Sequence, residues 1–176
     1  MKKKQRIFIS LLAVVVLVLA AAVTFVVIQT KNANTDPYQA KPAAPDLSTP
    51  EAAVKSYLAW ISYAYAIGDS NVSTPTMTPY EGVRIDSYVQ LYKERGQTLE
   101  QRLVKFAVTS SKISGKTATV KTKETWEYRY LLSSQPPDQQ KPALHQTVYV
   151  VTYHLKKSDS RWQVDSVDAT AKTKVQ

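Results

Sequence analysis

Residues 117–131, TATVKTKETWEYRYL, alternate between apolar and polar side chains over much of their length. A period of two residues is typical of a β-strand with one face turned to a core, because successive side chains of a strand point to opposite faces. The apolar members that share one face are Ala118, Val120, Trp126, Tyr128 and Tyr130. The stretch therefore predicts a strand whose aromatic side chains belong to the interior of the domain.

Three further segments have the composition of strands, and short polar turns or a proline-containing loop connect them. The expected strands are residues 104–113, 117–131, 147–155 and 161–169. In the first of them, Val104, Phe106 and Val108 would share the inner face. The third is apolar on both faces, as expected for a strand in the middle of a sheet. Four strands in series with short connections predict an antiparallel meander.

A helix is expected at residues 50–67, ahead of the strands. Ser48 and Glu51 have the spacing of a capping box; alternatively, Thr49 caps the helix and Pro50 takes its first position. Apolar side chains recur at three- and four-residue steps, and Gly68 ends the pattern. The members of this stripe are Val54, Tyr57, Leu58, Ile61, Ala64 and Tyr65.

A second helix is expected at residues 80–96, on a weaker pattern that Gly96 ends. Its apolar members are Tyr80, Val83, Tyr88, Leu91 and Tyr92. Helices followed by a run of strands indicate an α+β domain. We expect these helices to pack on one face of a curved four-stranded antiparallel sheet.

A separate segment at the start of the chain predicts a transmembrane helix. Residues 7–28 are 22 residues without a charge, and as a helix they would span about 33 Å at ~1.5 Å per residue. A hydrocarbon core is roughly 30 Å thick, so this is one full crossing. A cleaved signal peptide is the alternative, with small residues at 19–22. The apolar run continues beyond them, which favours an uncleaved anchor.

Charge sets the expected orientation and localisation. The tail of residues 1–6 holds three lysines and one arginine, which predicts a cytoplasmic N-terminus and a cell-membrane protein whose C-terminal domain lies outside. Residues 29–47 contain three prolines and are expected to form a linker. The extracytoplasmic domain would occupy residues 48–171, and residues 172–176 would form a tail.

The basic composition does not indicate a nucleic-acid partner. The chain carries a net charge of +9, but five of its 23 basic residues lie before residue 32 and serve as a topology signal. Residues 32–176 then hold 18 basic and 14 acidic residues, a charge of only +4. A mild excess of this kind is short of the basic footprint that binding to nucleic acid requires.

The anchor, the linker and the order of helices and strands together resemble the nuclear-transport-factor-2-like superfamily, of the membrane-anchored bacterial extracytoplasmic type. The resemblance covers residues 48–170 and is carried by TPEAAVKSYLAWISYAYAIGD (49–69) and TVYVVTYHLKKSDSRWQVDSVDA (147–169). It implies a sheet curled around a cavity that the helices close. Some members are isomerases or dehydratases, some bind small molecules, and others are membrane-anchored domains that bind protein partners.

One carboxylate has the position that an enzyme of this shape would need. In a regular strand Glu124 shares its face with Trp126 and Tyr128, so it would point inward, where a carboxylate in an apolar pocket can act as a base. The plainer alternative is that Glu124 lies near the open end or beyond a bulge, and meets a lysine or water. The candidate pocket-lining residues are Tyr57, Trp60, Tyr88, Tyr92, Glu124, Trp126 and Tyr128.

Other chemistries lack their residues. There is no cysteine, there are two separated histidines, and no HExxH motif occurs, so we expect no metal site. Four dispersed glycines form no phosphate-binding loop, and no G-x-S-x-G elbow is present. No cofactor is expected, and no catalytic residue is assigned.

Two functional classes remain. The favoured one is a single-pass membrane protein whose non-catalytic domain binds or scaffolds a protein partner in an envelope assembly, of the secretion or conjugation kind or associated with the cell wall. The alternative is a small-ligand-binding or enzymatic cone-shaped pocket, isomerase- or dehydratase-like, that uses Glu124.

Overall fold

The computed structural model describes residues 38–140 and 142–175. Helices come first and a four-stranded sheet follows, with the strands in the order β1-β2-β3-β4 and every neighbouring pair antiparallel. The elements are α2 (Pro50–Ile67), η1 (Ser70–Thr76), α3 (Pro79–Glu94), β1 (Gln97–Ser114), β2 (Thr117–Leu132), η2 (Pro137–Gln139), β3 (His145–Ser158) and β4 (Arg161–Val175). The predicted α+β class and the antiparallel meander are confirmed.

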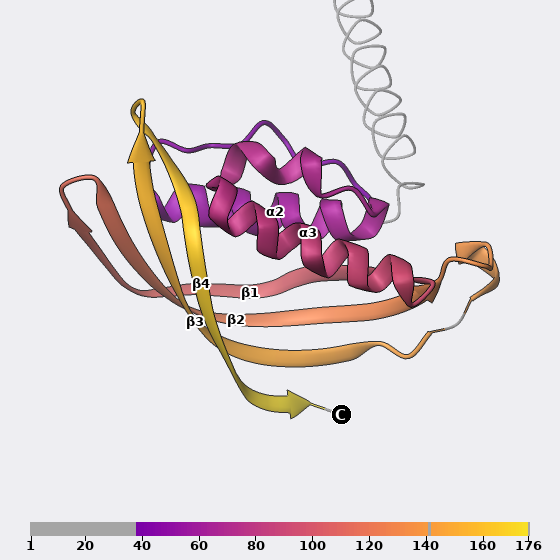
Figure 1. Cartoon of the computed structure of the whole chain (residues 1–176). Coiled ribbons are helices and arrows are strands. Elements are labelled where there is room, and N and C mark those ends of the chain that lie inside the picture. The colour runs from indigo at the N-terminus through magenta and orange to yellow at the C-terminus, as the bar shows by residue number, and fades with distance from the viewer. Residues whose placement is uncertain (1–37, 141, 176) are drawn as a thin grey trace, which may run out of the picture. The chain divides into compact units, whose positions relative to one another are not determined.

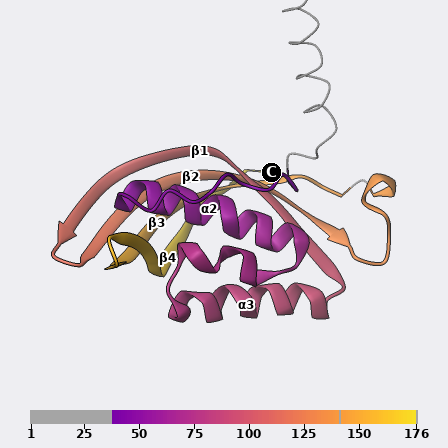
Figure 2. The ribbon, with the colours of Figure 1, turned by 90° about the horizontal axis from the view of Figure 1, so that it is seen from above.

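The sheet is curved, and the helices lie on its concave side. Figure 1 shows β1, β2 and β3 bending beneath α2 and α3, while β4 crosses in front of the helices at one end. Seen from above, α2 lies over the strands and α3 runs beside it, with η1 between them (Figure 2). One face of the sheet is therefore covered, as the order of elements predicts.

Local signals account for α2, which has the predicted bounds. The side chain of Thr49 accepts a hydrogen bond from the backbone N–H of Ala52, so Thr49 is the cap and Pro50 takes the first turn. Gly68 ends the helix in a left-handed conformation with φ of 68°. The buried side includes Val54, Tyr57, Leu58, Ile61 and Ala64, as the stripe predicts.

Two glycine substitutions should change stability in opposite directions. Gly68→Ala places a side chain at φ +68°, and its Cβ would lie 3.3 Å from Cε of Lys93, so we expect a loss of about 1 kcal/mol. Gly82 lies inside α3, where a Cβ would meet only Sδ of Met77 at 4.0 Å. Gly82→Ala should therefore raise the free energy of unfolding by about 0.5–1 kcal/mol. Urea denaturation measures both, and equal signs would contradict the assignment of α3.

The inward face of α3 differs from the prediction. The buried residues are Glu81, Ile85 and Val89, whereas Tyr80 and Val83 are 74% and 69% exposed. A carboxylate occupies the buried side because it finds hydrogen-bond donors there, which the apolar pattern alone does not reveal. The predicted helix exists, and Leu91 and Tyr92 of its pattern are half-buried, but the first part of the pattern faces outward.

β-Bulges correct the predicted face of β1. Leu103 pairs with Trp126 and Lys105 with Thr125, so Val104 is the extra residue, and a second shift follows Val108. Leu103 and Phe106 pack against the core, while Val104 is 41% exposed and Val108 is 40% exposed. A bulge reverses the alternation beyond it, so the simple period of two fails here.

The core lies between α2 and the middle of the sheet. On β2 the predicted lane is buried at Ala118, Val120 and Trp126, and Thr122 and Glu124 continue the same lane. The other buried apolar side chains that share this cluster come from α2, β3 and β4, with Leu47, Met77 and Ile85. The core therefore contains a polar strip within its apolar lane on β2.

The domain begins earlier and ends later than predicted. Residues 38–47 pack on it: Leu47 is buried, and its carbonyl oxygen accepts a hydrogen bond of 2.9 Å from the backbone N–H of Trp162. Six of these ten residues are exposed and none belongs to a helix or strand, as expected of a linker, but the segment contacts the domain. β4 continues to Val175, so residues 172–175, predicted as a tail, belong to a strand.

The predicted membrane anchor lies outside the described residues. The same holds for the basic tail and for residues 29–37 of the linker. In the part of the chain that the structure describes, no helix is both long enough and apolar enough to cross a bilayer.

Candidate functional site

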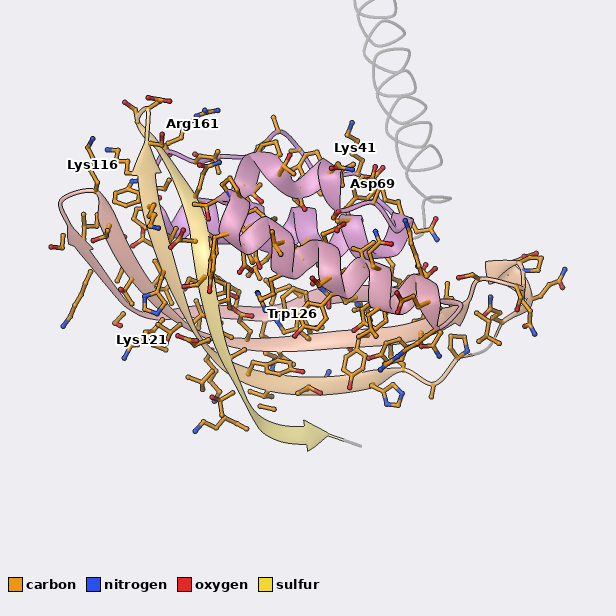
Figure 3. All side chains as sticks on the ribbon, in the orientation of Figure 1. Lys41, Asp69, Lys116, Lys121, Trp126 and Arg161 are labelled. Atoms are coloured by element: carbon orange, nitrogen blue, oxygen red, sulfur yellow. The ribbon has the colours of Figure 1, made fainter. Side chains whose placement is uncertain are left out.

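A cavity of about 270 Å³ lies between the helices and the concave face of the sheet. Its walls come from α2, α3 and all four strands. Figure 3 shows the labelled side chain of Trp126, one of the lining residues, in the layer between β2 and the helices. The curvature of the sheet and the two helices together make the space, as the resemblance implies.

Tyrosines dominate the lining. The seven that contribute are Tyr57, Tyr65, Tyr92, Tyr128, Tyr130, Tyr149 and Tyr153. Their rings form a connected series: Tyr65 meets Tyr92 at 6.2 Å between centroids, Tyr92 meets Tyr130 at 5.8 Å, and Tyr130 meets Tyr128 at 5.8 Å. His145 stacks on Tyr128 at 5.3 Å. Edge-to-face and stacked rings at these separations give the cavity stiff, aromatic walls.

Glu124 lies inside the domain and is 2% exposed. Its Oε1 accepts hydrogen bonds from Oγ1 of Thr122 at 2.6 Å and from the hydroxyl of Tyr153 at 2.6 Å. Its Oε2 accepts one from Nε1 of Trp126 at 2.8 Å. The inward direction expected from strand parity is correct, and no lysine forms an ion pair with Glu124 among the described residues. The three donors are neutral side chains.

A second buried carboxylate, Glu81, lies at the α2–α3 side of the cavity. It accepts hydrogen bonds from the hydroxyl of Tyr57 and from Arg84, whose Nε donates to Oε2 at 2.9 Å. Nη2 of Arg84 also donates to the hydroxyl of Tyr57 at 3.2 Å. The rings of Tyr57 and Tyr153 meet at 6.1 Å, so the two carboxylate clusters are neighbours. Glu81 is thus matched by a guanidinium.

Burial makes Tyr57, Tyr65 and Tyr153 weaker acids than an exposed tyrosine. Burial raises the pKa of Tyr57 well above its usual value, and the nearby charge of Glu81 adds to this effect. Burial also raises the pKa of Tyr153, and the negative charge of Glu124 is the second cause that raises it. Burial is also the main cause that raises the pKa of Tyr65. These hydroxyls therefore remain hydrogen-bond donors through the alkaline range in the folded protein.

Stability should fall in alkali because of these shifts. Both states keep the phenolic protons below the unfolded pKa of about 10; above it the unfolded chain loses protons that the folded chain retains. We expect the free energy of unfolding to fall steadily between about pH 10 and about pH 12. Urea titrations across this range test it, and Tyr153→Phe should show a shallower decline. A free energy of unfolding that is constant above the unfolded pKa would contradict the burial of these hydroxyls.

Five of the seven candidate residues line the cavity, and two do not. Tyr57, Tyr92, Glu124, Trp126 and Tyr128 are in the lining. Trp60 instead donates its indole N–H to the carbonyl oxygen of Ala43 at 3.1 Å, beneath residues 38–47. Tyr88 is 39% exposed, and Cζ of Arg84 lies over its ring at 5.8 Å from the ring centroid of Tyr88. Aromatic character alone does not place a side chain in the cavity, and the positions of Trp60 and Tyr88 on their helices direct them elsewhere.

The prediction missed several lining residues that the sequence signals only weakly. Tyr149, Val151 and Tyr153 alternate on β3, and this alternation could have been used, although the strand is apolar on both faces. Arg84 could not be found in this way, because a single arginine on a helix is normally a solvated charge.

The arrangement is suited to binding rather than to acid–base chemistry. Each buried carboxylate at the cavity already accepts hydrogen bonds from the protein's own donors. The contact between Nε2 of His154 and Oδ2 of Asp168 lies away from the cavity lining, with the side chains 45% and 80% exposed. Within residues 38–140 and 142–175, no group of three metal-ligating side chains occurs.

Comparison with known proteins shows the fold. No family model and no curated protein sequence matches the chain. It is similar in structure to the intermembrane space region of the chloroplast protein ARC6, with a TM-score of 0.57 and 18% identity over 74% of this chain and 100% of that chain. At that identity the likeness concerns the fold alone.

Two other solved structures are similar at lower scores. One is an NTF-2 like protein of unknown function from Shewanella oneidensis MR-1, with a TM-score of 0.43 and 17% identity over 69% of this chain and 98% of that chain. The other is a SEC-C motif containing protein from Rhodopseudomonas palustris, with a TM-score of 0.43 and 19% identity over 71% of this chain and 81% of that chain.

Proposed function

We propose that the chain is a single-pass membrane protein, anchored through residues 7–28, whose folded domain lies outside the cytoplasm and binds a protein partner in an envelope assembly. The domain does so without catalysing a reaction. The charge-free run of 22 residues behind a basic tail supports the anchor and its orientation. The assembly is of the secretion or conjugation kind or is associated with the cell wall.

The main support for a protein partner comes from exposed side chains on the outer side of α3. Tyr80 and Val83 are 74% and 69% exposed and lie about one helical turn apart. At the margin of this surface the guanidinium of Arg84 covers the ring of Tyr88. Tyrosine and arginine are enriched where proteins meet, and exposed apolar side chains grouped on one surface mark contact sites. We call Tyr80, Val83 and Tyr88 the α3 face.

The state of the buried carboxylates supports a non-catalytic domain. A general base must reach the proton that it removes, with a free lone pair directed at the substrate. The oxygens of Glu124 accept three hydrogen bonds from within the fold, and those of Glu81 accept hydrogen bonds from Tyr57 and Arg84. Using either as a base would require these hydrogen bonds to be rearranged.

Cysteine labelling tests the orientation, because the natural chain has no cysteine. Lys112 is an exposed residue of β1, and Lys112→Cys should react with a membrane-impermeant maleimide in intact cells. Lys3→Cys, on the predicted cytoplasmic tail, should react only after permeabilisation. The opposite pattern would overturn the localisation.

Site-specific photo-crosslinking in intact membranes tests the partner. A photoreactive residue at Val83 should give one discrete crosslinked species, and the same residue at Lys112 should not. Tyr80→Ala should abolish the species when the photoreactive residue stays at position 83. Exposed substitutions change stability by no more than about 0.5 kcal/mol, so unfolding would not explain the loss. Equal crosslinking at both positions, or none at Val83, would reject the α3 face.

A second function is favoured by a separate observation. The cavity combines a volume of about 270 Å³ with a carboxylate, Glu124, that is 2% exposed. A concave, mostly aromatic site with a few polar groups is the usual form of a small-ligand site. We therefore propose the cavity as a candidate ligand site, in addition to the α3 face as a candidate partner site.

A further inference from the structure

Glu124 is a buried carboxyl group whose hydrogen-bond partners are all neutral side chains. Its three hydrogen-bond donors are the two hydroxyls of Thr122 and Tyr153 and the indole N–H of Trp126. The indole can only donate, and all three groups direct a donor at the carboxyl oxygens, which is the arrangement of an anion. Among the ion pairs of the described residues, none includes Glu124.

The other charges of the cavity do not compensate it. Arg84 is the one basic residue in the lining, and it forms an ion pair with Glu81, which is 1% exposed. Glu81, Arg84 and Glu124 together therefore leave one negative charge unmatched. A buried carboxylate without a cation is costly, and hydrogen bonds from neutral groups offset only part of that cost. A positively charged ligand would supply the partner that the lining does not offer to Glu124.

The walls suit the same kind of ligand. The negative faces of tyrosine rings attract ammonium groups that lie within about 6 Å of their centroids, and recognition of quaternary ammonium by aromatic residues uses this attraction. Tyr57 and Tyr153 lie beside Glu124, and Tyr92, Tyr130 and Tyr128 continue the aromatic wall. Tyrosines supply this attraction without adding a second charge.

Size and access set further limits. A volume of about 270 Å³ lies just below the usual range for ligand pockets, which is about 300–1,000 Å³. It admits a small headgroup and excludes a large ring system. Tyr130 lines the cavity and is 37% exposed, so the cavity reaches solvent at this end of β2.

We propose that the cavity binds a small organic cation, an ammonium or quaternary ammonium compound, with Glu124 as its counter-charge and the tyrosine rings as its walls. This inference rests on the cavity being a ligand site, the second of the two functions above, and is independent of the α3 face. No covalent step is involved.

Calorimetric titration of the full-length protein in a neutral detergent tests the charge requirement. The probes are choline and its uncharged carbon analogue 3,3-dimethylbutan-1-ol, which have nearly the same shape. Choline should bind at least about tenfold more tightly, as expected when a charge-dependent interaction distinguishes the two. Equal affinities would overturn the cation assignment and keep the cavity as an apolar ligand site. Binding of neither probe would overturn both.

Three variants locate the binding. Glu124→Gln keeps the shape of the side chain and removes its charge, so choline affinity should fall at least about tenfold while that of the alcohol changes little. Tyr130→Leu changes a partly exposed wall residue, which the fold tolerates better, and should weaken choline several-fold. Lys112→Gln, away from the cavity lining, should leave both affinities unchanged. If both cavity variants fold and still bind choline as tightly as the natural protein, the inference is overturned.

The photo-crosslinking experiment separates this inference from the proposed partner. A cavity that binds neither probe leaves crosslinking at Val83 unaffected, because the α3 face is on the outer side of its helix. Loss of crosslinking at Val83 likewise leaves the choline titration as it was. The two proposals therefore fail separately.

Discussion

Trp162→Ala is expected to lower the free energy of unfolding by about 4 kcal/mol, the range for removal of a large aromatic side chain from a core. Trp162 is 3% exposed and belongs to the main hydrophobic cluster. Its backbone N–H also donates to the carbonyl oxygen of Leu47, and Leu47 belongs to the same cluster. Removing the side chain of Trp162 would leave a cavity in this cluster.

Trp60→Ala is the matched control, because it removes the same side chain from a less enclosed place. Trp60 is only half-buried and makes one hydrogen bond of 3.1 Å, to the carbonyl oxygen of Ala43. A loss of no more than about 1.5 kcal/mol is expected. Guanidinium denaturation of both variants gives the comparison. Equal losses would show that the packing around Trp162 is not that of a core residue.

The second large effect is expected at Glu81. Glu81→Ala removes the acceptor of both Tyr57 and Arg84, whose donors then have no carboxylate partner. Breaking a buried ion pair costs about 3–5 kcal/mol, but the side chain of Arg84 is 41% exposed and can turn to water. We therefore expect a loss of about 2–3 kcal/mol.

Glu94→Ala, on the same helix, separates this effect from a change in helix propensity. Glu94 is an exposed residue in the last turn of α3, and its substitution should change stability by less than about 0.5 kcal/mol. Thermal denaturation of the two variants in the same buffer is the measurement. A loss at Glu81 no larger than that at Glu94 would mean that the buried carboxylate contributes little to the fold.

The two proposals use different parts of one domain. The α3 face lies on the outer side of a helix whose inner side carries Ile85 and the carboxylate of Glu81. The cavity lies on that inner side, and Arg84 contributes to its lining while its guanidinium covers Tyr88 of the α3 face. A partner on α3 and a cation in the cavity would thus contact neighbouring residues, although each proposal stands on its own observations.

The sequence by itself determined the strands, their order and the first helix. Alternation places Trp126 and Glu124 on one face of β2, and a stripe that begins at Val54 and is capped at Thr49 defines α2. These features depend on steric and hydrogen-bonding preferences within a few residues, so they can be read locally. The inward direction of Glu124 followed from the same alternation, because β2 is regular against β3 through that point.

Only the tertiary structure decided the phase of α3, the inner face of β1, the state of Glu124 and the packing of residues 38–47. Glu81 is buried because Tyr57, 24 residues earlier, donates to it, and Glu124 is held by Tyr153, 29 residues later. The bulge at Val104 arises where β1 pairs with β2. The carbonyl oxygen of Leu47 accepts a hydrogen bond from the backbone N–H of Trp162. Each outcome depends on a group distant in sequence, and apolar periodicity carries no information about where a polar side chain will find its partner.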